Sequence, residues 1–183
     1  MRIENLKREY DIDVRLVHFP LHPETPADGI PLQKLFGAGP DELAARQARM
    51  KGLMDAEGLP YGDRTHTYNS RLAQELGKWA DTQDDGEALH DLLYKAYFVD
   101  GRNIGDPEVL VELAQAAGLD GEAARAVLNG RTFKDAVDED WNWSRSVGVT
   151  GVPTFVAGRS GVVGAQPYEV LKQLLETAGA RKL

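Results

Sequence analysis

The spacing of apolar residues predicts that the chain starts with a helix followed by a strand. Ile3, Leu6 and Tyr10 recur at helical intervals. Residues 13–19 are rich in β-branched and aromatic side chains, which are typical of strands. The run stops at Pro20, and because proline has no N–H to donate to a neighbouring strand, an extended loop is expected after it.

A helical pattern fills the middle of the chain, from residue 41 to about residue 130. Within it, Asp106 and Pro107 are typical of an N-cap and a first helical position, and Gly118 is a typical stop. A further short helix is expected over residues 122–128. We interpret the whole block as a helical insertion.

The last part of the chain predicts a helix, a hairpin and a second helix. Residues 133–147 have helical spacing and end at Gly148. Two short apolar runs, residues 153–157 and 161–165, flank a glycine-containing turn, which predicts a hairpin. A final helix is expected from Pro167 onwards.

The order of the expected elements indicates an α/β fold, and length and composition favour one domain over residues 1–183, with the insertion at about 41–130. The length of 183 residues and the 42% hydrophobic content are enough for a sizeable core. The net charge of -8 repels nucleic-acid phosphates, and no apolar run approaches the ~20 residues that span a bilayer. Nucleic acid and membranes are therefore not expected as partners. Residues 1–7 are charged and do not resemble a signal peptide, so a cytoplasmic location is expected.

The chain contains no cysteine, which limits its chemistry. Thiolates are the nucleophiles of disulfide exchange, and no other side chain replaces both sulfurs, so no catalytic residue is predicted. His18 and His22 are four residues apart, but Pro20 and Pro23 exclude the helix on which that spacing would form a metal pair. Neither a metal site nor a cofactor is predicted.

Several further motifs are interpreted as structural. Residues 138–140 are acidic and precede Trp141, which is typical of a solvated helix face, although Trp141 and Trp143 could also border a cleft. Residues 69–71 are interpreted as a helix cap, because Ser70 has no histidine base at a recognisable spacing. Arg102 and Asn103 are expected to hold a loop.

Five runs of sequence carry a family resemblance that extends from residue 2 to about residue 178. They are FPLHPETP (19–26), YNSRLA (68–73), YFVDGRNI (97–104), GVTGVPTF (148–155) and GAQPY (164–168). On these runs the chain resembles the DsbA family of thiol-disulfide oxidoreductases, in the FrnE-like branch that is related to 2-hydroxychromene-2-carboxylate isomerases.

The resemblance implies a thioredoxin-like fold with a large helical insertion. In that fold the first strand is central and leads into a Cys-x-x-Cys motif, which is expected immediately upstream of Arg2 and is missing from this chain. The resemblance also implies a cis bond between Val152 and Pro153 that presents the Val152 backbone to an extended peptide or a small thiol such as glutathione. Thr150 and Gly151 shape the same loop. The alternative interpretation is that Pro153 only begins a strand.

Loss of a central strand would leave the backbone groups of its two neighbours unpaired. Three outcomes are open: the neighbours close up and pair, a second copy donates a segment in a homodimer, or the gene product starts upstream of Met1. We expect the third for the gene, and a homodimer for this chain.

Three functions follow from these observations. The first is membership of the DsbA-like oxidoreductase family, with a chain that is redox-inactive as given and keeps the cis-proline substrate-binding face. The second is a glutathione-dependent isomerase or transferase of the 2-hydroxychromene-2-carboxylate isomerase type. The third is a non-catalytic thioredoxin-fold module that binds peptides.

Overall fold

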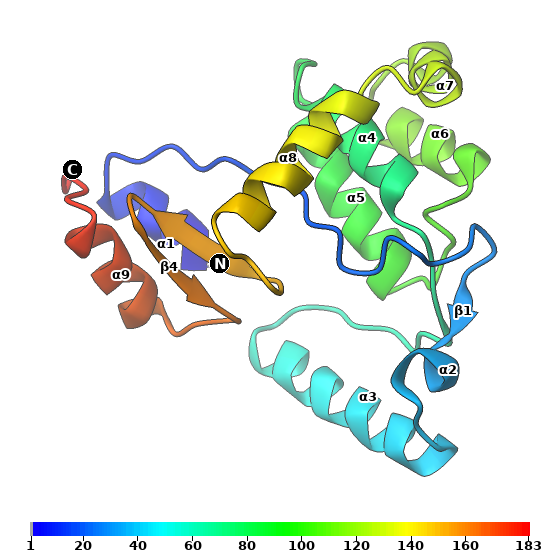
Figure 1. Ribbon diagram of the computed structural model, residues 1–183, viewed down its shortest axis with the longest axis horizontal. Helices are drawn as coiled ribbons and strands as arrows, with labels where there is room; N and C mark the ends of the chain where they lie inside the picture. Colours follow the sequence, from blue (N-terminus) through cyan, green and yellow to red (C-terminus); the bar gives the residue numbers. More distant parts are fainter. Residues whose placement is uncertain (1) are drawn as a thin grey trace. The chain divides into compact units, whose positions relative to one another are not determined.

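The computed structural model describes residues 2–183, and Figure 1 shows their helices and strands. The helices are α1 (Arg2–Glu9), α2 (Leu32–Phe36), α3 (Pro40–Ala56), α4 (Arg71–Ala80), α5 (Glu87–Phe98), α6 (Pro107–Ala116), α7 (Gly121–Gly130), α8 (Lys134–Ser146) and α9 (Tyr168–Thr177). The strands are β1 (Ile30–Pro31), β2 (His66–Thr67), β3 (Thr154–Ala157) and β4 (Ser160–Val163). No helix within residues 2–183 has both the length and the apolar composition needed to cross a membrane.

These residues form two compact units. Residues 22–138 make up a helical unit, and residues 2–21 together with 139–183 make up a hairpin unit. The predicted insertion at about 41–130 falls inside the helical unit.

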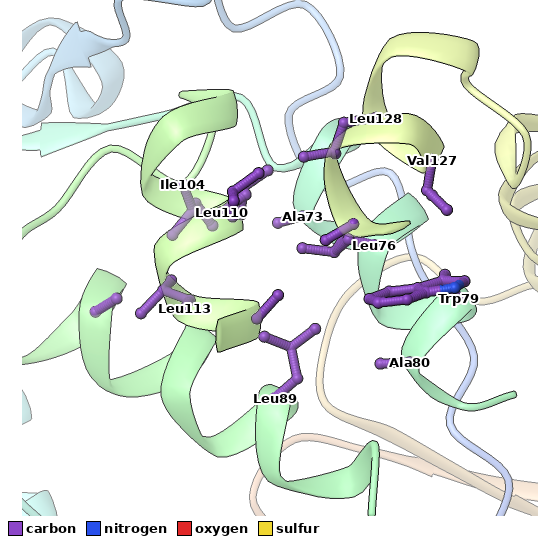
Figure 2. Packing of buried hydrophobic residues seen from close by; sticks show 14 residues of the cluster. Ala73, Leu76, Trp79, Ala80, Leu89, Ile104, Leu110, Leu113, Val127 and Leu128 are labelled. Atoms are coloured by element: carbon purple, nitrogen blue, oxygen red, sulfur yellow. The ribbon is translucent and has the colours of Figure 1, made fainter. Parts of the chain in front are cut away.

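The core of the helical unit lies among α4, α5, α6 and α7, which pack against one another. Figure 2 shows Leu76, Leu89 and Leu110 in this core, and all three are completely buried. Burying a leucine side chain stabilises a fold by about 1.5–3 kcal/mol, so these positions supply much of the unit's stability. The predicted helical pattern is confirmed here, although it is divided into separate helices.

The predicted helix boundaries around α6 are confirmed at atomic detail. The Asp106 side chain accepts a hydrogen bond from the Glu108 N–H at 2.9 Å, and Pro107 is the first helical residue. Gly118 follows the helix with φ +85°, a left-handed conformation that glycine adopts without a Cβ clash. Asp120 caps α7 in the same way as Asp106 caps α6.

The structure contains a two-residue ladder between β1 and β2 that the sequence did not predict. Ile30 of β1 pairs with Thr67 of β2, and the Leu32 N–H donates to the Thr65 carbonyl at 2.9 Å. Strands this short carry no alternation of apolar and polar residues, so their sequence gives no strand signal.

The hairpin unit is built on β3 and β4, which pair antiparallel with Phe155 opposite Val162. These two side chains pack against a small core formed by Leu6 and Tyr10 at α1 and by Leu171 in α9. The Tyr10 hydroxyl donates to Glu176 at 2.8 Å, which ties the end of α1 to α9. Tyr10 also forms an isolated bridge with Lys182.

The strand predicted over residues 13–19 is wrong. The segment has no regular secondary structure, and Val14 and Leu16 are exposed. A strand needs a ladder partner as well as β-branched residues, and no described segment runs beside this one as a strand. Within residues 2–183, β3 pairs with β4 alone. Direct pairing between the two strands that would flank the missing central strand, one of the three expected outcomes, is therefore not observed.

Candidate functional site

The predicted binding residues lie in the loop between α8 and β3. α8 ends at Ser146, and Gly148 follows with φ +75°. The Val149 N–H donates to the Ser144 carbonyl at 2.9 Å, which satisfies one of the last carbonyls of the helix. This glycine therefore turns the chain out of α8 and into the loop.

Thr150, Gly151, Val152 and Pro153 fill this loop, and the peptide bond between Val152 and Pro153 is cis. The Thr150, Val152 and Pro153 side chains are exposed, and Val152 keeps 51% of its surface accessible. The Thr154 hydroxyl donates to the Gly151 carbonyl at 2.6 Å, which holds the loop against the start of β3. The loop is thus held in place while its side chains face solvent.

The outer edge of β3 presents unpaired backbone groups. Ala157 and Ser160 face each other across a two-residue turn. In such a hairpin the closing pair is hydrogen-bonded, and bonded pairs alternate with non-bonded ones, so Phe155 also bonds to β4. The N–H and C=O groups of Thr154 and Val156 therefore point away from β4, towards the edge that no strand within residues 2–183 occupies.

Val152 lies immediately before this edge, at the cis bond, and its backbone has no hydrogen-bond partner among residues 2–183. The next residue is bonded, because the Pro153 carbonyl accepts the Gly164 N–H at 2.7 Å. The outward groups of Thr154 and Val156, with the unbonded backbone of Val152 before them, form an edge to which an extended chain can add as a strand.

The same hairpin has one uncovered apolar face. Val156 and Val163 lie opposite the face that packs on the helices, and they keep 42% and 56% of their surface accessible. Exposed valines beside an open strand edge add apolar contact area to the backbone groups described above. The arrangement can bind an extended, partly apolar segment.

The acidic run before Trp141 is not the solvated helix face that was predicted. Only Glu139 is exposed. Asp140 is buried, and its carboxylate accepts the His18 N–H at 3.0 Å and lies 3.3 Å from the Arg15 guanidinium. Its charge thus fixes the extended segment before His22, an arrangement that the local sequence does not reveal.

The neighbouring Asp138 is also engaged. Its carboxylate contacts Lys134 at 2.6 Å and Arg71 at 2.7 Å. The hydrogen bonds from Lys134 and Arg71 hold the pKa of Asp138 below its usual range.

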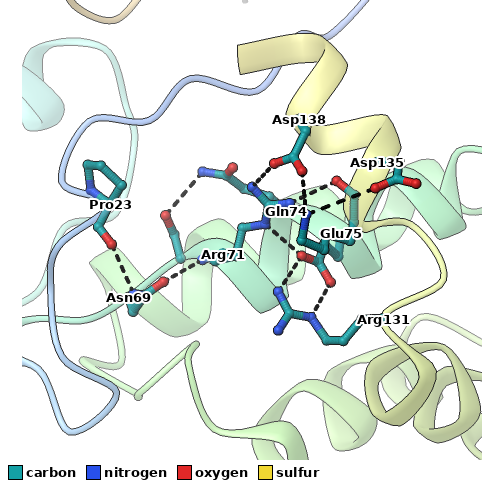
Figure 3. Close-up of polar contacts among 10 residues, drawn as sticks. Pro23, Asn69, Arg71, Gln74, Glu75, Arg131, Asp135 and Asp138 are labelled. Carbon is teal, nitrogen blue, oxygen red and sulfur yellow. Dashed lines mark hydrogen bonds and ion pairs between the residues drawn. The ribbon is translucent and has the colours of Figure 1, made fainter. Parts of the chain in front are cut away.

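A buried charge network in the helical unit was missed by sequence reasoning. Figure 3 shows the Glu75 carboxylate between two guanidinium groups, with Arg71 at 2.6 Å and Arg131 at 2.6 Å. Glu75 is fully buried. Burial by itself would raise the pKa of Glu75, but hydrogen bonds from Arg131 and Arg71 outweigh it and lower the pKa. The i,i+4 spacing of Arg71 and Glu75 was the one available signal, since Arg131 is 56 residues away.

The predicted structural roles of the other motifs hold with one change. The capping bond at α4 comes from Asn69, whose side-chain oxygen accepts the Arg71 N–H at 2.9 Å, whereas Ser70 makes no side-chain cap. Asn103 holds its loop as predicted, because its side chain donates to the Ala27 carbonyl and accepts the Gly105 N–H.

The loop offers groups for hydrogen bonding and apolar contact. The sequence has no cysteine to place at the loop. Within residues 2–183, no three histidine, aspartate or glutamate side chains gather as metal ligands. The groups that the loop offers are backbone donors and acceptors, valine side chains and the proline ring.

Comparison with known proteins places this geometry in a family. The model of the DsbA-like thioredoxin domain matches residues 1–176. The crystal structure of a probable DsbA oxidoreductase from Streptomyces coelicolor has a TM-score of 0.87 and 35% identity, and the match covers 97% of this chain and 82% of that one. A 2-hydroxychromene-2-carboxylate isomerase has a TM-score of 0.71 over 97% of this chain and 85% of its own. Its 18% identity supports a likeness of fold alone.

A curated relative matches over a shorter length. The uncharacterised protein YwbO of Bacillus subtilis is 29% identical over 118 residues, which are 64% of this chain and 58% of YwbO. The match therefore spans little more than half of that relative. The predicted thioredoxin-like fold with a helical insertion is confirmed, and the chain belongs to the DsbA-like thioredoxin domain family.

Proposed function

We propose that this chain binds an extended peptide or a small thiol at the Val152–Pro153 loop, without carrying out thiol-disulfide exchange itself. The observation that carries the proposal is the row of outward-facing backbone groups at Thr154 and Val156, preceded by the unbonded backbone of Val152. An added strand would take its hydrogen bonds from this row and its apolar contacts from Val156 and Val163. Thr150 and Gly151 set the path of the loop that leads into it.

The absence of exchange chemistry follows from the side chains. Exchange requires a thiolate to attack a disulfide sulfur, and the 183 residues contain none. Family membership supports a role related to disulfide chemistry, with this chain supplying the surface that faces the substrate. We propose that the chain belongs to the FrnE-like branch, because it carries the five sequence runs. We also propose that it is cytoplasmic and that it forms a homodimer.

Binding is tested with a pair of proline variants on the two outer edges of the hairpin. Val156→Pro removes an outward N–H at the proposed edge of β3. Gly161→Pro removes the equivalent outward N–H on β4, because Gly161 faces Val156 in a non-bonded pair and contributes no side chain to the proposed surface. Neither change breaks a ladder bond. The probe is a fluorescein-labelled, cysteine-free peptide of alternating valine and threonine, and the readout is fluorescence anisotropy.

We expect Val156→Pro to weaken binding about fivefold, since one hydrogen bond is worth about 1 kcal/mol. Gly161→Pro should leave affinity within about twofold of the parent chain, a difference of less than about 0.5 kcal/mol. Equal losses in both variants, or no binding of the peptide to the parent chain, would contradict the proposal.

The redox part is tested separately with the 183-residue chain in an insulin-reduction assay. The expected rate equals that of a cysteine-free control protein at the same concentration. Turnover above that control would show that the chain performs exchange through groups other than its own thiols.

The isomerase-like alternative has a likeness of fold in its favour. It predicts that glutathione perturbs the amide signals of residues 149–154 in a heteronuclear NMR titration. If the chain binds the peptide but shows no response to glutathione, the isomerase-like alternative is excluded and the peptide proposal stands.

A further inference from the structure

The helical unit contains an arginine that lies against aromatic rings and has no carboxylate partner. The Arg64 guanidinium carbon is 4.4 Å from the centre of the Tyr97 ring and 4.8 Å from that of Phe98. The Phe98 ring contacts Tyr94 at 4.5 Å between centroids and Tyr61 at 6.5 Å. Arg64 therefore belongs to a cluster of four aromatic rings.

The backbone around Arg64 is fixed from three sides. The Gln47 side chain of α3 donates to the Arg64 carbonyl at 2.5 Å, and Leu32 donates to the next carbonyl, that of Thr65. Gly62 packs so closely on the end of α5 that a Cβ there would collide with the Val99 carbonyl oxygen. These contacts fix the backbone, and the Tyr97 and Phe98 rings contact the guanidinium itself, so less ordering entropy remains to oppose binding.

The charge of Arg64 is not balanced within residues 2–183. Arg64 forms no ion pair there, and its Nε is buried without a hydrogen-bond partner. Three other half-buried arginines each contact a carboxylate: Arg71 with Glu75, Arg102 with Glu112 and Arg125 with Glu108. The neighbouring Asp63 is exposed and makes no ion pair with Arg64. In a chain with net charge -8, an unpaired and immobilised arginine is unusual.

We propose that the Arg64 guanidinium, held over Tyr97 and Phe98, is a binding site for a small oxyanion, either a carboxylate or a phosphate. The rings lie against the guanidinium and its Nε is buried, so the terminal Nη groups are the donors left for the ligand. A guanidinium donates two parallel hydrogen bonds to the oxygens of either group, and contact with ring faces does not consume those donors. Tyr94, whose ring is half-exposed, borders the site.

The test is an NMR titration of the 183-residue chain that follows the arginine Nε–Hε signals. The probes are sodium phosphate and sodium acetate, each compared with sodium chloride at matched ionic strength. The Arg64 signal is assigned as the one missing from the Arg64→Lys variant. We expect this signal to shift saturably with at least one probe, together with the ring signals of Tyr97 and Phe98. The probe that saturates at the lower concentration identifies the preferred oxyanion.

Two variants separate specific binding from general attraction. Arg64→Lys keeps the charge but loses the planar fork, so the saturable shift of the Tyr97 and Phe98 rings should weaken at least several-fold. Arg159→Gln removes an exposed arginine from the hairpin turn and should leave the titration unchanged. A response that is linear in concentration and equal to that of chloride would overturn the proposal. So would equal saturation in the Arg64→Lys variant. If a variant does not fold, the ring signals of Tyr97 and Phe98, assigned in the parent chain through their own backbone signals, decide between saturable and linear response.

Discussion

The helical unit and the hairpin unit bury their apolar surfaces in different ways. In the helical unit, α4, α5, α6 and α7 enclose a shared core, and the Glu75 network holds the surrounding segments together. In the hairpin unit, helices cover one face of β3 and β4, while Val156 and Val163 on the other face stay exposed. The candidate binding edge thus lies in the unit that leaves apolar side chains and strand backbone groups exposed. The helical unit has the larger enclosed core of the two.

Removing the buried carboxylate with Glu75→Ala tests how much the charge network stabilises the helical unit. Arg131 would then lose the carboxylate that it contacts, and Arg71 would lose one carboxylate partner while keeping Asp138. Breaking a buried ion pair by removing one partner costs about 3–5 kcal/mol, so we expect a large fall in the urea midpoint of the helical unit. Circular dichroism during urea unfolding measures it.

The matched control for that experiment is Glu108→Ala, which removes the carboxylate of the exposed pair with Arg125. Exposed pairs contribute little to stability, so the midpoint should barely move. If both variants lost the same stability, the network would not distinguish the helical unit.

A variant in the hairpin unit tests whether the two units unfold separately. Leu171→Ala removes a buried side chain from the small core of the hairpin unit. Leucine-to-alanine changes in a core cost about 2–5 kcal/mol. We expect amide hydrogen exchange to accelerate in residues 154–163 and 168–177, while α4 to α7 keep their protection. Uniform acceleration along the chain would mean that the two units unfold as one.

A third prediction concerns acid. The pKa of Glu75 is lowered in the folded chain, so its charged form stabilises the fold fully above the unfolded pKa of about 4.3. That stabilisation is lost as the pH falls through the lower, folded-state pKa. The urea midpoint of the helical unit should therefore drop between about pH 5 and pH 3.

The Glu75→Gln variant should show a shallower drop over the same pH range. Some dependence should remain, because the pKa of Asp138 is also lowered. An unchanged slope would show that Glu75 does not carry this part of the acid sensitivity.

The smallest expected effect comes from two glycines at the candidate loop, Gly148 before it and Gly151 within it. Neither would bring an added Cβ near another atom, but Gly148 has φ +75° and Gly151 does not have a left-handed conformation. Gly148→Ala should therefore destabilise the hairpin unit by about 1 kcal/mol, and Gly151→Ala should be close to neutral. Thermal unfolding of the two variants in parallel measures the difference.

Local signals explain what the sequence predicted well. Asp106 and Pro107 fixed the start of α6, and the glycine-containing turn fixed the hairpin, because these residues act on neighbours within a few positions. The path of the loop at residues 150–153 followed from a family resemblance and not from spacing.

The failures share a cause, which is dependence on residues far away in the chain. Residues 13–19 have strand propensity, but whether a strand forms depends on a partner that propensity does not specify. Asp140 was expected in solvent because its helix neighbours are acidic, yet it is buried by its contacts with Arg15 and His18. Nothing in the local sequence around Glu75 or Arg131 indicates the contact between them, because they are 56 residues apart.

The sharing of one carboxylate by two guanidinium groups constrains how this protein can evolve. If Glu75 became neutral, Arg131 would lose the carboxylate that it contacts and Arg71 would keep Asp138, whereas loss of Arg131 alone would leave Glu75 with a single arginine. Each single replacement is harmful, although a concerted apolar replacement of the set need not be. Positions 71, 75 and 131 are therefore expected to change together among homologues or not at all.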